Sequence, residues 1–276
     1  MSIRSTVGSV LSRNRSSNLE AEREAIVQRL FITLHKACHK NDEPPKEKHV
    51  RTAICQTHEA QSAVLFWKLA AKLPLAVNAV TCWKFAYLVH KLLRDGHQSM
   101  IKDSRAYISR LEELAKYWSH IQGYGPLING YFKLVIHKIR FQNKYAFLPG
   151  TINPPDDIEE KLGRDLDPMF EFVLEILDYL EALMLVQGEI FKTMDRSRSS
   201  MATLSGQNRL SPCIPIILDS QQLYSLAVKY LSILHTQVFT EKMLFYFCHF
   251  LTRPKIEIFA IRVWQEVYNN GTHRPV

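Results

Sequence analysis

The sequence has little glycine and no long apolar run. Ten of its 276 residues are glycine, and the longest obvious apolar stretch, MLFYFCHFL, covers only residues 243–251. A membrane-spanning helix needs about 20 consecutive apolar residues, so we expect any membrane role to be peripheral. The N-terminal residues MSIRSTVGSVLSRNRSSN also lack the apolar core of a secretory signal, so we do not expect secretion.

Paired cysteine motifs are absent as well. The chain has five cysteines, widely spaced and without a Cys-x-x-Cys pair: Cys38, Cys55, Cys82, Cys213 and Cys248. This distribution argues against a disulfide framework and against a zinc ribbon. It favours reduced thiols in a cytoplasmic protein.

Motifs for catalysis and for nucleotide binding do not occur. The stretch GYGPLING at 123–130 lacks the glycine spacing and the lysine of a P-loop, and no nucleophile or metalloprotease motif is present. His35, Cys38 and His39 have the spacing of one helical turn, but a structural zinc site wants four ligands and no second cluster is evident. We therefore expect a protein that is not an enzyme and that has no cofactor or metal site.

Positive charge is what the sequence does have, and it is unevenly distributed. The net charge is +8, with 46% hydrophobic residues. Residues 1–56 hold ten Lys and Arg against six Asp and Glu, whereas residues 155–195 hold three against twelve. A basic excess suits nucleic acid, a phospholipid surface or an acidic protein. No nucleic-acid-binding module is recognisable, so we expect no nucleic acid partner.

Helical spacing of apolar residues dominates the chain. It predicts an all-α fold, a superhelical, solenoid-like array of antiparallel helices. Ser17 and Glu20 have the spacing of a capping box at the first helix start. We expect a flexible basic segment at 1–17, a helical domain at 18–237 and a C-terminal segment of unknown structure at 238–276. The helices are predicted at about 19–40, 45–58, 61–73, 75–95, 102–121, 126–146, 168–194 and 212–237.

The stretch KACHKNDEPPKEKH at 36–49 is the candidate binding site. Pro45 has the position of a first helical residue, and Lys46, Lys48 and His49 follow it. Cations at a helix N-terminus are repelled by the positive end of the helix dipole. A polyanion that binds there removes this repulsion and accepts hydrogen bonds from the unpaired N–H groups. Lys36 would approach from the preceding helix, with Lys40 as a further candidate. A solvated lysine-rich turn is the ordinary alternative.

The same stretch resembles the lipid-binding signature of ANTH domains, which is Lys-Ala, a spacer, and then Lys-x-Lys-His after a proline or valine. Here the signature stands as Lys36-Ala37 and PKEKH at 45–49. The segments CWKF at 82–85 and HKLLRDGH at 90–97 further resemble the huntingtin-interacting protein 1 family, which links clathrin coats to actin. The resemblance covers roughly residues 19–237, and residues 238–276 no longer resemble the family.

The resemblance implies a fold and a function. It implies a superhelical all-α domain that binds phosphatidylinositol 4,5-bisphosphate through Lys36, Lys46, Lys48 and His49 at the inner plasma membrane and clathrin-coated pits. It implies clathrin and actin partners through C-terminal parts that this sequence lacks, and a second endocytic adaptor on the same lipid. The alternative is a helical scaffold whose basic patch binds an acidic protein.

Overall fold

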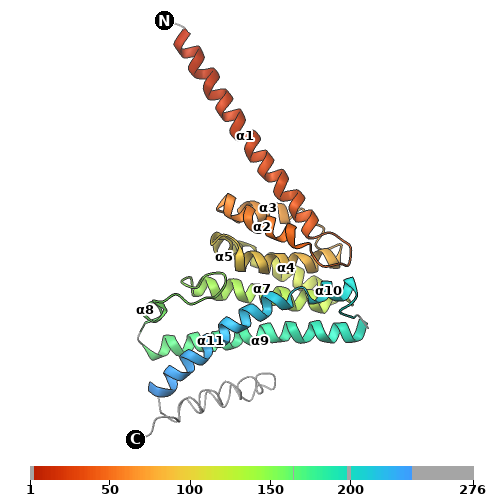
Figure 1. Ribbon diagram of the computed structural model, residues 1–276, viewed down its shortest axis with the longest axis vertical. Helices are drawn as coiled ribbons and strands as arrows, with labels where there is room; N and C mark the ends of the chain where they lie inside the picture. Colours follow the sequence, from red (N-terminus) through yellow and green to blue (C-terminus); the bar gives the residue numbers. More distant parts are fainter. Residues whose placement is uncertain (1–2, 164, 198–199, 238–276) are drawn as a thin grey trace.

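The structure is a computed structural model, and it describes residues 3–163, 165–197 and 200–237. Within these ranges all regular structure is helical (Figure 1). The principal helices are α1 (Ile3–Ala37), α2 (Glu47–Ala60), α3 (Val64–Ala70), α4 (Ala79–Asp95), α6 (Ile108–Ser119), α7 (Gly125–Lys144), α9 (Leu166–Ser197) and α11 (Cys213–Gln237). Short elements between them are α5 (Ser99–Ser104), η1 (Arg105–Tyr107), α8 (Ile158–Leu162) and α10 (Leu204–Leu210).

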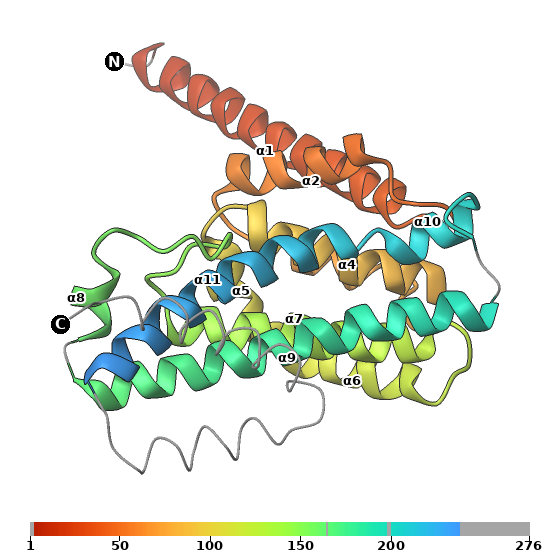
Figure 2. The ribbon, with the colours of Figure 1, turned by 60° about the horizontal axis from the view of Figure 1, so that its bottom comes forward.

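The helices stack in chain order, and the last one folds back over the stack. α1 packs on α2 and α3, α2 on α4, α4 on α7, and α7 on both α6 and α9 (Figure 1). α11 packs on α9 and also contacts α4 (Figure 2). The N-terminal half of α1 extends away from the other helices (Figure 1). The predicted all-α superhelical array is therefore confirmed.

The helix ends differ from prediction in three places. α1 begins at Ile3 and runs through Ser17, so the predicted capping box there is wrong. α2 begins at Glu47 with Lys46 as its N-cap, so Pro45 lies before the helix and is not its first residue. The region predicted as one helix at 102–121 is divided among α5, η1 and α6. The flexibility expected for residues 1–17 stays a prediction, and residues 238–276 lie outside the described ranges.

α4 forms the centre of the stack. All residues from Thr81 to His90 are buried. The helix begins after Asn78, whose side chain accepts a hydrogen bond from Thr81 N at 2.8 Å. It ends, as predicted, at Gly96, where a Cβ would lie 2.4 Å from Leu92 O. A buried central helix gives the layers on both sides a rigid reference.

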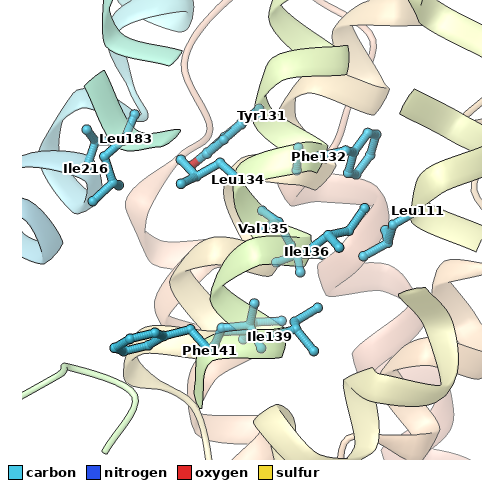
Figure 3. Packing of buried hydrophobic residues seen from close by; sticks show 14 of the residues in the cluster. Leu111, Tyr131, Phe132, Leu134, Val135, Ile136, Ile139, Phe141, Leu183 and Ile216 are labelled. Atoms are coloured by element: carbon cyan, nitrogen blue, oxygen red, sulfur yellow. The ribbon is translucent and has the colours of Figure 1, made fainter. Parts of the chain in front are cut away.

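A second part of the core joins α6, α7, α9 and α11. Leu111 of α6 lies beside Val135 and Ile136 of α7, while Leu183 of α9 faces Ile216 of α11 (Figure 3). Each fully buried side chain of this kind contributes about 1.5–3 kcal/mol relative to exposure. This packing holds α6 and α7 as an antiparallel pair whose outer surface remains open to solvent.

Candidate functional site

The start of α2 is an uncapped helix N-terminus made of cationic residues. Lys46 is the N-cap, with φ −68° and ψ 120°, and no side chain caps the helix there. Lys46 O accepts hydrogen bonds from His49 N at 2.9 Å and from Val50 N at 3.4 Å. The N–H groups of Glu47 and Lys48 belong to the first turn, whose donors have no partner within the helix.

The structure brings four of the predicted site residues together. The pKa of His49 is lowered first by partial burial and then by the charges of Lys48, Lys36 and Lys46, so all three lysines lie close enough for their charges to act on its ring. The three lysines are exposed, and none forms an ion pair within the described ranges. Lys40 is exposed too, but it is not among the groups that shift His49. We name the group Lys36, Lys46, Lys48 and His49 the cationic edge.

A buried lysine holds the α1–α2 loop from beneath. Lys84 of α4 is 0% exposed, and its Nζ donates to Asn41 O at 2.7 Å and to His39 O at 3.0 Å. Burial lowers the pKa of Lys84 to about 8, although Cys38, Glu43 and Asp42 act against the shift. The sequence analysis named Lys84 only as part of CWKF at 82–85 and predicted no such role for it.

A carboxylate ties the same loop to distant helices. Asp42 accepts hydrogen bonds from Tyr124 Oη at 2.6 Å, Ser205 Oγ at 2.8 Å and Asn208 Nδ2 at 2.9 Å. Burial alone would raise the pKa of Asp42, but these hydrogen bonds and Arg209 bring it below its usual value. The α1–α2 loop, which separates Lys36 from Lys46, is thus fixed from α4, from the start of α7 and from α10. No sequence motif marked these residues.

The His35, Cys38 and His39 turn has a packing role. Burial raises the pKa of the Cys38 thiol to about 12, which disfavours the thiolate that a metal needs. The His35 ring packs edge-on against Phe31 with ring centroids 4.4 Å apart, and His39 Nε2 lies 3.2 Å from Glu43 Oε1. Within the described part of the chain, no group of three or more His, Cys, Asp or Glu residues could hold a metal ion.

A helix that crosses a bilayer must be both long and apolar. None of the described helices combines the length and the apolar character needed to cross a bilayer.

The described helices form a stack with an exposed cationic edge, and comparison with known families identifies the class of domain. The family model of the ANTH domain matches residues 29–253, so the chain belongs to the ANTH domain family. The match continues past the predicted domain end at 237, into residues outside the described ranges. The resemblance seen in the sequence is confirmed.

Two relatives indicate which branch of the ANTH family this chain resembles. The chain is 39% identical over 231 residues to human Huntingtin-interacting protein 1, covering 82% of this chain and 22% of that protein. It is 38% identical over 218 residues to Huntington interacting protein related 1 of Caenorhabditis elegans, covering 78% and 24%. The chain thus spans about a quarter of the length of these relatives.

Solved structures support the fold. The ENTH domain from epsin-2 in complex with phosphatidylinositol 4,5-bisphosphate matches with a TM-score of 0.73 at 20% identity, covering 90% of this chain and 93% of that one. The endocytic adaptor complex AENTH matches with a TM-score of 0.72 at 24% identity, covering 89% and 93%. At these identities the likeness extends to the fold alone.

Proposed function

We propose that this chain is a phosphoinositide-binding module of an endocytic adaptor and that it binds phosphatidylinositol 4,5-bisphosphate at the cationic edge. The observation that carries the proposal is the convergence of Lys36, Lys46, Lys48 and His49 on one helix N-terminus. Neighbouring relatives are consistent with it, since one structural neighbour was solved with this lipid.

The chemistry of the cationic edge suits a multiply phosphorylated ring. Lys36 lies in the last turn of α1, whereas Lys46 and Lys48 lie at the start of α2. Two phosphates of one headgroup could therefore contact lysines from different helices. The first-turn N–H groups and the helix dipole add favourable interactions with an anion, the dipole about 0.3–1 kcal/mol. Mutual repulsion among the three lysines is relieved when the phosphates bind.

The loop is preorganised for this contact. Lys84 and Asp42 hold it by hydrogen bonds before any ligand arrives. A site that does not need to be ordered on binding keeps more of its interaction energy as affinity. The proposal places the module in the cytoplasm, at the inner plasma membrane and coated pits. Clathrin and actin would be reached through parts of the relatives outside the matched region, and a second endocytic adaptor would share the same lipid.

Liposome co-sedimentation tests the headgroup site. Vesicles containing phosphatidylinositol 4,5-bisphosphate are compared with phosphatidylserine vesicles of equal surface charge, at physiological salt. We expect preferential pelleting with the inositol lipid, and at least a tenfold loss of affinity for Lys46→Glu/Lys48→Glu, since two phosphate contacts become repulsive. The matched control is Lys68→Glu/Lys102→Glu, which makes the same charge change at two other exposed lysines.

Two results would oppose the proposal. Equal pelleting on both lipids would indicate a generic basic surface without a headgroup site. Equal weakening by the control variant would show that net charge, rather than the cationic edge, drives binding.

A further inference from the structure

A second basic region lies between α6 and α7. These helices enclose an open groove of about 440 Å³. Its α6 wall is formed by Glu112, Ala115, Lys116 and Ser119, and its α7 wall by Asn129, Lys133, Ile136, His137 and Arg140. Spacings of three and four residues put each set on one helix face. We call this the α6–α7 groove; it shares no residue with the cationic edge.

The floor of the groove is apolar, and the charges at one of its ends are paired. Ala115 and Ile136 are each 4% exposed and form an apolar floor. At one end Arg140 Nη2 donates to Glu112 Oε1 at 2.6 Å, so this cation and this acid neutralise each other across the groove. The bond joins the two antiparallel helices across the groove, while their apolar packing sets the register.

Two cations in the groove form no ion pair in the part of the chain that the structure describes. Lys116 and Lys133 are exposed and form no ion pair within residues 20–163 or elsewhere in the described ranges. They line opposite walls, and the Glu112–Arg140 register puts them within about one helical turn of each other. Burial lowers the pKa of His137, whose ring packs on Tyr179, so it adds no charge at neutral pH. A carboxylate between the two lysines would relieve their repulsion.

From this arrangement we propose that the α6–α7 groove binds an acidic peptide segment of a partner protein. The groove runs from Asn129 to Arg140, about 16 Å along α7 at 1.5 Å per residue. That length matches about five residues of extended peptide and exceeds one lipid headgroup.

The chemical groups along the groove also favour a peptide. Its lysines are spread along two walls rather than gathered at a helix N-terminus. The Asn129 amide offers both a donor and an acceptor to a peptide main chain, while the apolar floor accepts a small apolar side chain between carboxylates. The recognised class is therefore a short acidic segment with small apolar residues, held chiefly by Lys116 and Lys133.

Fluorescence anisotropy with a labelled Glu-Ala-Glu-Ala-Glu peptide tests the proposal on the full chain at 150 mM salt. Its uncharged counterpart carries Gln in place of Glu. We expect the Glu peptide alone to bind, with affinity rising up to about five residues and then levelling off. Lys116→Glu/Lys133→Glu should weaken binding at least about tenfold, and Asn129→Ala should weaken it several-fold.

Controls separate the groove from general charge and from the lipid site. Lys68→Glu/Lys102→Glu should leave peptide affinity within about twofold, and so should Lys46→Glu/Lys48→Glu. Vesicle binding should survive in Lys116→Glu/Lys133→Glu, which keeps this test independent of the headgroup proposal. Circular dichroism verifies that each variant remains helical.

Four results would overturn the proposal. They are absence of Glu-peptide binding, equal weakening by the Lys68/Lys102 control, loss of peptide binding in the Lys46/Lys48 variant, and loss of vesicle binding in the groove variant with peptide binding unchanged. The last result would assign the groove to lipid instead.

Discussion

Lys84 and Lys138 are both 0% exposed, but the structure stabilises their charges in opposite ways. Lys84 of α4 is held by the carbonyl oxygens of His39 and Asn41, with no carboxylate in an ion pair with it in the described ranges. Lys138 of α7 contacts a carboxylate, with its Nζ 2.8 Å from Asp219 Oδ2 and 3.0 Å from Gly150 O. One lysine holds the loop before α2, and the other joins helices of the core.

Asp219 contacts more polar side chains than Lys84 does. Its Oδ2 also accepts from His90 Nε2 at 2.9 Å and from Tyr179 Oη at 3.1 Å, and its Oδ1 pairs with Arg94. Burial would raise the pKa of Asp219, but Lys138 and His90 bring it well below its usual range. α4, α7, α9 and α11 therefore meet at a single carboxylate. The difference teaches that a buried lysine can hold either a loop or the core, depending on whether its partner is a loop carbonyl or a core acid.

The largest effect is expected for Asp219→Ala. The substitution leaves the buried Lys138 without its counter-charge and removes one of the two carboxylates paired with Arg94. Breaking a buried pair in this way costs about 3–5 kcal/mol. Urea unfolding followed by circular dichroism measures the free energy of unfolding. The control Asp156→Ala, at an exposed acid, should change it by less than about 0.5 kcal/mol. Equal small losses in both variants would contradict the ionic account of the core.

Lys84→Met should cost less stability but more function. It leaves two loop carbonyls without a donor, a loss of about 1–3 kcal/mol, and it should weaken vesicle binding because the α1–α2 loop is no longer fixed. Lys138→Met provides the contrast, since it should unfold more easily yet bind vesicles normally below its unfolding temperature. Reduced vesicle binding by Lys138→Met and not by Lys84→Met would reverse the comparison.

The contributions of Asp219 and Lys84 to the free energy of unfolding should change over different pH ranges. The folded pKa of Asp219 lies below the unfolded value of about 3.9, so its stabilisation is complete above that pH and is lost as the pH falls toward the folded value. The pKa of Lys84 is lowered from 10.5 to about 8, so its burial cost is complete below pH 8 and is relieved as the pH rises toward 10.5. Unfolding free energies measured across pH should show a weaker acid slope in Asp219→Asn, where Asp42 still contributes, and a weaker alkaline rise in Lys84→Met, where Lys138 still contributes. An unchanged alkaline slope in Lys84→Met would contradict the second assignment.

Tyr124→Phe should give the smallest effect. It removes the hydrogen bond to Asp42, which is worth about 0.5–1.5 kcal/mol, and it keeps the ring packed beside Trp83. Vesicle affinity should fall by a few-fold at most, less than for Lys84→Met, because Ser205 and Asn208 still hold Asp42. A larger loss than that of Lys84→Met would make Asp42, rather than Lys84, the principal anchor of the loop.

The sequence predicted what depends on local spacing. Apolar periodicity gave the all-α class, and the Lys-Ala and Lys-x-Lys-His motif marked the residues that the structure gathers at the start of α2. It could not reveal the short helices α5, α8 and α10, because five to seven residues hold too little periodicity.

Long-range polar contacts were beyond sequence reasoning. His90 and Asp219 are 129 residues apart and belong to different helices, so their hydrogen bond leaves no spacing to recognise. Lys84 resembles any helix-surface lysine in the sequence, because its acceptors are carbonyls positioned by a loop conformation. The α6–α7 groove likewise depends on the register of two helices, which is set by their apolar packing.

The return of the last helices to the first ones has a consequence for how the molecule comes apart. A linear stack in which each layer contacts only its neighbours can lose its ends one layer at a time. Here Trp83 Nε1 donates to Asn208 O at 3.0 Å, Asp42 is held by Ser205 and Asn208, and Asp219 lies among α4, α7 and α9. These contacts connect the end of the described chain to its beginning, so fraying of α10 or α11 also loosens the loop before α2. Hydrogen exchange should therefore report one cooperative unit, in which amides at the two ends of the stack open together.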